Sequence, residues 1–247
     1  MSTNLQKFFI IFLIFTSINS SSSIKVQCEF SIESKFTPMP YVYSCVVIRD
    51  LKVIKPGTIV DEIEGNHEVN KFNNDVAAVY LENKEMNFLL TGFTTFFPKL
   101  ITMSMMSCKL KEIKQNDLKG YPNLQYLMMA RNELEVLEND LFKHNKDLIY
   151  INVNENKLKK IDENIFDDLK QLNFLNLLSN DCIQMFGHGK NRVARIIKNV
   201  KEKCSERKKK VKGTGWLIFK SWIFWCCLVL VVLVIFVVAG FIVVKAN

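Results

Sequence analysis

A short apolar pattern returns every 24 residues over much of this 247-residue chain. The pattern is L-x-x-L-x-L-x-x-N-x-L, and its five copies begin at Val76, Leu100, Leu124, Leu148 and Leu172. Apolar residues alternate within a copy, as at Leu127 and Met129, which indicates a short strand with one side turned inward. A fixed period of this length predicts a solenoid, in which each unit buries its apolar side against its neighbours.

The asparagine of the pattern has a separate physical role. Asn132, Asn156 and Asn180 follow predicted strands, where the chain turns and leaves backbone groups that a short amide side chain can satisfy. These three residues predict an asparagine ladder along the solenoid. The first two copies depart from the pattern, because Lys84 and Cys108 occupy this position.

This pattern resembles the leucine-rich-repeat family, of the 24-residue type that is common in extracellular and receptor ectodomains. In layout the chain is similar to small insect membrane-anchored leucine-rich-repeat glycoproteins. The resemblance covers about residues 76–183. It implies an α/β solenoid, a right-handed coil with a parallel concave β-sheet. It also implies that Cys108, a known replacement for the asparagine, is a buried free thiol without chemistry.

The N-terminal segment is typical of a secretory signal peptide. Residues 1–20 contain a polar start closed by Lys7, an apolar run from Phe8 to Ile18, and small serines that suit cleavage. The run is too short to cross a hydrocarbon core of about 30 Å. An N-terminal membrane anchor is the alternative interpretation.

An apolar segment near the C-terminus predicts a transmembrane helix. Residues 222–244 carry no charge and are long enough to cross a bilayer with some tilt. The three tryptophans lie at its start, where an interfacial belt is expected: Trp216, Trp222 and Trp225. A signal for a GPI anchor near Gly213 is the alternative, although no polar spacer follows.

The cysteines predict a disulfide at each end of the solenoid. Cys28 and Cys45 lie in a stretch that predicts a β-hairpin, and Cys182 and Cys204 bracket the C-terminal end. Between the latter pair, one face of an amphipathic helix is formed by Val193, Ile196, Ile197 and Val200. A solenoid needs caps over its open core, and two bridges fit an oxidising compartment. The sequence does not fix their connectivity.

These observations together predict seven consecutive segments and an outward-facing ectodomain at the plasma membrane. The segments are a signal peptide (1–20), an N-terminal cap with a β-hairpin (24–75), five repeats (76–181), a C-terminal cap helix (182–205), a basic juxtamembrane stalk (206–215), a transmembrane segment (216–244) and a cytosolic tail (245–247).

The net charge of +8 is concentrated in one stretch. Residues 190–212 contain eight lysines and three arginines against two glutamates, so this stretch is +9 and the rest of the chain is −1. Basic residues beside a span usually stay cytoplasmic, which opposes the outward topology, whereas the signal peptide and paired cysteines favour it. In an extracellular chain this stretch predicts contact with anionic lipid or sulfated glycan rather than nucleic acid.

The sequence contains no pattern that is typical of an enzyme. Its three histidines, His67, His144 and His188, lack metal-ligand spacing and a partner nucleophile motif. A Gly-rich phosphate loop is also missing. We therefore expect a protein that is not an enzyme and that needs no metal or cofactor.

The concave sheet is the predicted binding surface. Its outward positions should carry the ligand-binding residues Tyr126, Met128, Tyr150, Asn152, Phe174 and Asn176. Adjacent strands lie about 4.8 Å apart, so the three rings should form a contiguous aromatic ladder facing water. Aromatic residues with few charges are typical of interface cores. The alternative is that this ladder only stiffens the sheet.

Two functions follow from this surface. The first is a membrane-anchored recognition or adhesion protein that binds a protein or peptide ligand and acts as a co-receptor, since a three-residue cytosolic tail cannot signal. The second is a structural protein that self-associates, as a homodimer, through its apolar concave faces. The same binding module on a GPI anchor is a variant of the first.

Overall fold

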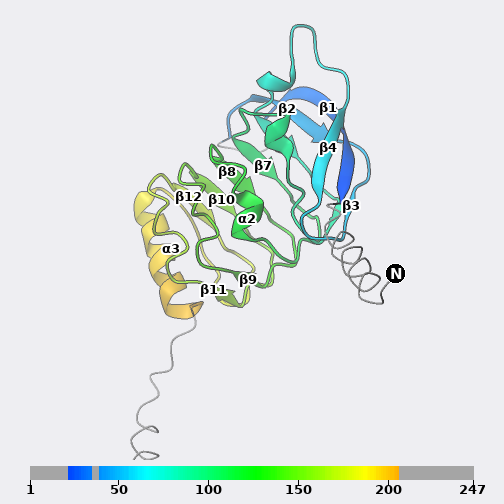
Figure 1. Cartoon of the computed structure of the whole chain (residues 1–247). Coiled ribbons are helices and arrows are strands. Elements are labelled where there is room, and N and C mark those ends of the chain that lie inside the picture. The colour runs from blue at the N-terminus through cyan, green and yellow to red at the C-terminus, as the bar shows by residue number, and fades with distance from the viewer. Residues whose placement is uncertain (1–21, 35–38, 206–247) are drawn as a thin grey trace, which may run out of the picture. The chain divides into compact units, whose positions relative to one another are not determined.

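Nine strands form one continuous sheet along the described chain, which comprises residues 22–34 and 39–205 of a computed structural model (Figure 1). The strand order is β13-β12-β10-β8-β7-β5-β2-β1-β4. The strands are β1 (Ser23–Glu33), β2 (Val42–Val47), β4 (Ile59–Glu64), β5 (Ala78–Tyr80), β7 (Thr102–Ser104), β8 (Tyr126–Met128), β10 (Tyr150–Asn152), β12 (Phe174–Asn176) and β13 (Phe186–His188).

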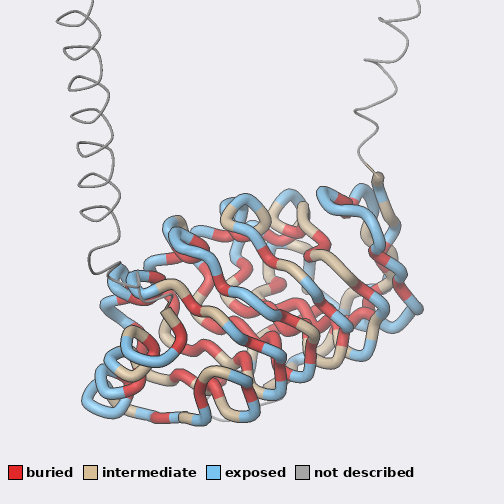
Figure 2. The backbone as a smooth tube through the Cα atoms, turned by 90° about the horizontal axis from the view of Figure 1, so that it is seen from below, coloured by how far each residue is buried: buried red, intermediate tan, exposed pale blue. Residues whose placement is uncertain are grey.

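The five repeats contribute one parallel strand each, namely β5, β7, β8, β10 and β12. Their central residues pair in register, so Met103, Leu127 and Ile151 follow one another across the sheet and are fully buried. Figure 2 shows that buried residues recur along the stacked coils, with exposed residues at the bends. The predicted solenoid with a parallel sheet is confirmed.

A left-handed residue turns the chain after each repeat strand. The residues with positive φ at these turns recur every 24 positions: Asn83, Ser107, Arg131, Glu155 and Ser179. Left-handed backbone is uncommon outside glycine. It recurs one residue before the ladder position in all five copies, including those with Lys84 and Cys108, and in three copies the side chain that follows the turn contacts the neighbouring coil.

Those contacts are hydrogen bonds from buried asparagines to neighbouring coils. The Asn156 side chain accepts from the N–H of Leu134 at 3.1 Å and donates to the carbonyls of Met129 at 2.9 Å and Val153 at 3.1 Å. Asn132 and Asn180 make the same set of bonds one coil earlier and one coil later. Each amide therefore satisfies buried backbone groups of two consecutive coils.

Cys108 occupies the ladder position of the second copy with a different bonding pattern. Its thiol donates to the carbonyl of Leu81 at 2.6 Å, and its backbone N–H donates to the Oδ1 of Asn132 at 3.0 Å. Burial raises the pKa of the Cys108 thiol to about 11. Because the thiolate is the reactive species, this cysteine is structural.

Short elements cover the remaining sides of the coil. They are the 3-10 helices η1 (Asn73–Asp75) and η2 (Phe93–Thr95), the helix α2 (Gln115–Leu118), and two parallel strand pairs, β3 (Lys52–Val53) with β6 (Glu85–Met86) and β9 (Val136–Leu137) with β11 (Lys160–Ile161). Phenylalanine rings fill the core beneath them, with Phe142 and Phe166 stacked at 6.0 Å between centroids.

A disulfide-linked cap closes each end of the solenoid. At the N-terminal end, β1 and β2 pair as antiparallel strands and are joined by the Cys28–Cys45 bond. At the other end, the helix α3 (Lys190–Lys203) packs its buried face against the last coil and is held by the Cys182–Cys204 bond. The predicted disulfides at both ends are confirmed. Figure 1 shows the two caps at opposite ends of the repeat sheet.

Among the described residues, no helix is long and apolar enough to cross a membrane. The segments predicted to be the signal peptide (1–20), the stalk (206–215), the transmembrane segment (216–244) and the cytosolic tail (245–247) lie outside the described residues.

Candidate ligand-binding surface

Two rows of side chains point outward from the concave face of the sheet. The register of the strands makes the first row Ala78, Thr102, Tyr126, Tyr150, Phe174 and His188. The second row is Tyr80, Ser104, Met128, Asn152, Asn176 and Phe186. Both rows alternate with the buried core residues of the same strands, as the period of a β-strand requires.

The aromatic residues of the first row are in contact. The rings of Tyr126 and Tyr150 lie 6.1 Å apart at 36°, and those of Tyr150 and Phe174 are stacked 4.2 Å apart at 3°. In-register parallel pairing places equivalent residues side by side, which brings the three rings into one line. Aromatic pairs of this kind contribute about 0.5–1.5 kcal/mol beyond their buried area.

The N-terminal and central parts of this face are covered. Tyr126 is 9% exposed, Tyr150 is 6% exposed and Met128 is fully buried. Met39, which precedes β2, is buried in one apolar cluster with these residues and with Tyr80. The Ser34 hydroxyl donates to the Met39 carbonyl at 2.8 Å, which holds the two ends of the β1–β2 connection together.

The prediction that the whole concave face is open to water is therefore wrong. The 24-residue pattern specifies which side of a strand faces outward, but a connection in the cap lies outside that pattern. We call the buried outward-facing residues that cluster with Met39 the covered region: Ala78, Tyr80, Tyr126, Met128 and Tyr150. Burial here also raises the pKa of Tyr126, and burial raises the pKa of Tyr150 against a smaller opposing effect of the Asn152 side chain.

The C-terminal end of the same face is accessible. We call the residues Asn152, Phe174, Asn176, Phe186 and His188 the open region. The first three are partly exposed, His188 is exposed, and Phe186 is 58% exposed, which is high for a large apolar side chain. A small hollow of about 50 Å³ lies beside them, lined by Tyr126, Ile149, Tyr150, Asn173, Phe174 and His188.

The strand β13 extends this open region beyond the repeats. It pairs with β12 in the antiparallel direction, which places His188 beside Phe174 and Phe186 beside Asn176. The side chains of Asn173 and His188 are hydrogen-bonded at 3.1 Å. Sequence reasoning assigned these positions to the cap and missed them, although the alternation of Phe186, Gly187 and His188 was a signal.

Gly187 allows the cap helix to approach β13 closely. A Cβ atom at this position would lie 2.8 Å from the Cβ of Arg192 on α3, so a larger residue would push the helix away. The exposed Phe186 and His188 are thus fixed by a packed glycine between them.

Within residues 22–34 and 39–205, no group of three or more His, Cys, Asp or Glu side chains could hold a metal ion. His67 is hydrogen-bonded to the Tyr43 hydroxyl at 3.1 Å and to Asn73 at 2.8 Å, in the N-terminal cap. The described part of the basic stretch is α3, where Lys201 pairs with Asp167 at 2.8 Å.

The comparison with protein families identifies the repeats. The family model described as "Leucine rich repeat" matches residues 122–181. These residues are leucine-rich repeats. They include β8, β10, β12 and all three ladder asparagines, and the in-register strand β7 continues the same geometry before them. No curated protein matches the chain in sequence.

Three solved structures show the similarity of this chain to known proteins. A structure of TLR13 in complex with ssRNA13 matches with 19% identity, a TM-score of 0.41, and coverage of 50% of this chain and 18% of that chain. The Toll–Spätzle complex of Drosophila has the same identity, TM-score and coverage of this chain, with 17% of that chain covered. The internalin InlF of Listeria monocytogenes matches with 15% identity, a TM-score of 0.36, and coverage of 58% and 37%. The matched region thus spans well under half of each of these longer chains.

Proposed function

We propose that this protein is a membrane-anchored extracellular recognition protein that binds a protein or peptide ligand on the open region of its concave face. The observation that carries this proposal is the exposed Phe186, which lies beside Asn176 in the row next to the Tyr150–Phe174 stack. Exposed aromatic side chains flanked by amides and a histidine combine apolar area with hydrogen-bonding groups, which is typical of protein interfaces.

Burial in the covered region reduces the set of predicted residues that can contact a ligand. Phe174, Asn152 and Asn176 remain accessible, whereas Tyr126, Met128 and Tyr150 are buried beside them in the same two rows. We add Phe186 and His188 to the proposed contact residues because β13 places them in the same two rows. A partner protein would transmit any signal, since we propose a co-receptor or adhesion role without a signalling domain of its own.

The binding experiment uses a matched pair of substitutions. Phe186→Ala in a secreted form of residues 22–205 should lose captured partners from tissue extract, and should keep its melting temperature because the ring is largely exposed. Phe72→Ala removes a ring that is 66% exposed elsewhere, in the N-terminal cap, and should capture the same partners as wild type. If both variants capture the same set, the open region is not the binding surface.

Light scattering separates ligand binding from self-association. We expect the same secreted form to be a monomer at micromolar concentration. A dimer that Phe186→Ala dissociates would instead support the homotypic function.

The proposed anchoring is tested by topology. An epitope tag inserted at Val69, an exposed position in the N-terminal cap, should be accessible on intact cells that express the full chain. Phospholipase C should not release it. A tag detected only after permeabilisation contradicts the outward ectodomain, and release by the lipase indicates a GPI anchor.

A further inference from the structure

A backbone ladder on the flank of the solenoid is broken at one place. The N–H of Asn87 donates to the carbonyl of Val53 at 2.8 Å, and the N–H of Lys111 donates to that of Asn87 at 3.0 Å. Between the third and fourth repeats, the N–H of Lys159 donates to the carbonyl of Glu135 at 2.9 Å. The equivalent bond between Glu135 and Lys111 is missing from the described chain. The N–H of Glu135 and the carbonyl of Lys111 therefore lack the hydrogen bond that the equivalent groups of neighbouring repeats make.

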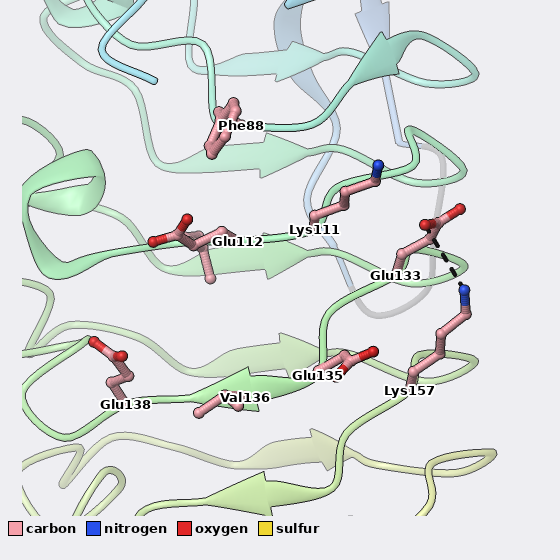
Figure 3. A pocket seen from close by; sticks show the side chains of 9 residues that line it. Phe88, Lys111, Glu112, Glu133, Glu135, Val136, Glu138 and Lys157 are labelled. Carbon is pink, nitrogen blue, oxygen red and sulfur yellow. Dashed lines mark ion pairs between the residues drawn. The ribbon is translucent and has the colours of Figure 1, made fainter. Parts of the chain in front are cut away.

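The break coincides with a groove between two short sheets. β3 pairs with β6 and β9 pairs with β11, but the intervening residues 109–114 form no strand with either pair. The groove has a volume of about 640 Å³ (Figure 3). Its lining residues are Phe88, Lys111, Glu112, Ile113, Glu133, Glu135, Val136, Glu138 and Lys157.

The lining combines an apolar base with an acidic rim. Phe88, Ile113 and Val136 provide apolar surface. The other lining residues are four glutamates and two lysines. Figure 3 shows Glu112 and Glu138, from neighbouring segments, at the same end of the groove. The lining residues of the groove therefore carry a net negative charge, next to two backbone groups that lack a hydrogen bond.

Neighbouring lysines neutralise only part of this acidic rim. Glu133 pairs with Lys157 at 3.7 Å, Glu135 pairs with Lys159 at 2.9 Å and Glu112 pairs with Lys114, but these side chains are well exposed. Exposed pairs contribute little, so a cationic ligand can replace the lysines at small cost. Glu138 makes no ion pair with a described residue. It is the acid most available to a partner.

We infer that this groove binds an extended, basic peptide segment of a partner protein. An extended backbone presents both donors and acceptors, which matches the open N–H of Glu135 and carbonyl of Lys111. Its side chains alternate, so apolar residues can meet Phe88 and Val136 while Lys or Arg residues on the other side meet the glutamates. The groove lies on the flank, away from the concave rows, so this inference does not rest on the proposed function.

The test measures binding of a short fluorescein-labelled peptide of alternating lysine and valine to the full chain. Wild type should bind it saturably, more weakly at higher salt, and should not bind the matching peptide of alternating glutamate and valine. Glu138→Lys should weaken binding by about tenfold or more, because it reverses the charge at the rim. Glu163→Lys, an exposed charge reversal outside the groove, should bind as wild type does.

A second variant separates binding from folding. Val136→Lys places a positive charge on the partly exposed apolar base, which repels the lysines of the peptide, and should also weaken binding, while the melting temperature stays close to that of wild type. Three results would overturn the inference: no saturable binding to wild type, equal binding of the acidic peptide, or equal effects of Glu138→Lys and Glu163→Lys. Self-association that Glu138→Lys abolishes, without peptide binding, would also overturn it and assign the groove to a second copy.

Discussion

The covered and open regions of the concave face are built from equivalent repeat positions, yet they differ in access to solvent. Met128 and Asn176 occupy the same position two repeats apart, and one is fully buried while the other is partly exposed. The difference lies outside the repeats, because Met39 packs on the first region and β13 extends the second. Caps therefore decide which part of a repeated surface is available for binding.

The two disulfides should stabilise these regions separately. Cys204→Ser frees α3, which supports β13 and the open region, and should lower the free energy of unfolding by about 2–5 kcal/mol. Cys28→Ser loosens the cap that carries Met39, and should lower stability by a similar amount. Thermal melting measures both. If Cys204→Ser melts like wild type, the C-terminal cap does not depend on its disulfide.

A pair of asparagine substitutions separates the interior from the face. Asn156→Ala leaves buried backbone groups of two coils unpaired, and should cost about 3 kcal/mol, since each such group costs about 1–3 kcal/mol. Asn176→Ala removes a partly exposed side chain that accepts only from the N–H of Leu178, so it should cost less than about 1 kcal/mol. Chemical denaturation compares them. If both substitutions lower the free energy of unfolding equally, the ladder asparagine is not more important for stability than the accessible Asn176, which contradicts this account.

Met39→Ala tests whether Met39 buries the covered region. Truncation of a buried methionine should cost about 2 kcal/mol, at the low end for such changes because the site is near the surface of the face. The same substitution should expose Tyr126 and Met128. Met185→Ala, in a partly buried position at the opposite end, is the control and should leave their exposure unchanged.

The tyrosines report the smallest expected effect. Burial raises the pKa of Tyr126 and Tyr150 above the ordinary value of about 10. A raised folded-state pKa contributes stability that is complete below the unfolded pKa and is lost as pH rises through the folded value. Stability should therefore fall above about pH 10. Ultraviolet titration, assigned with Tyr126→Phe and Tyr150→Phe, should show both pKa values moving down in Met39→Ala. Unchanged values would mean that Met39 does not bury them.

The repeat geometry could be predicted from the sequence because it depends on local periodicity. The alternation around Leu127 determines the strand and its inward side, and the 24-residue spacing places Tyr126, Tyr150 and Phe174 in one row. The cysteine positions predicted a disulfide at each end for a similar reason, since the ends of the repeat pattern mark where caps are needed.

The features that decide accessibility could not be predicted in the same way. Met39 is packed against strands that are distant in sequence, and this packing of the cap on the face has no periodic signal. The break between Lys111 and Glu135 is equally hidden, because both copies have the same spacing of apolar residues. Phe186 and His188 carried a recognisable alternation, but it was short and lay beyond the last asparagine.

The most direct test of the covered and open regions is hydroxyl-radical footprinting of the full chain, read residue by residue by mass spectrometry. Phe174, Phe186 and His188 should be oxidised in the native state, and Met128 should be protected although its sulfur is readily oxidised when accessible. Cys108 provides a buried internal control, and Met39→Ala should make Met128 reactive. Rapid oxidation of Met128 in the native wild-type chain, or protection of Phe186, would contradict the account.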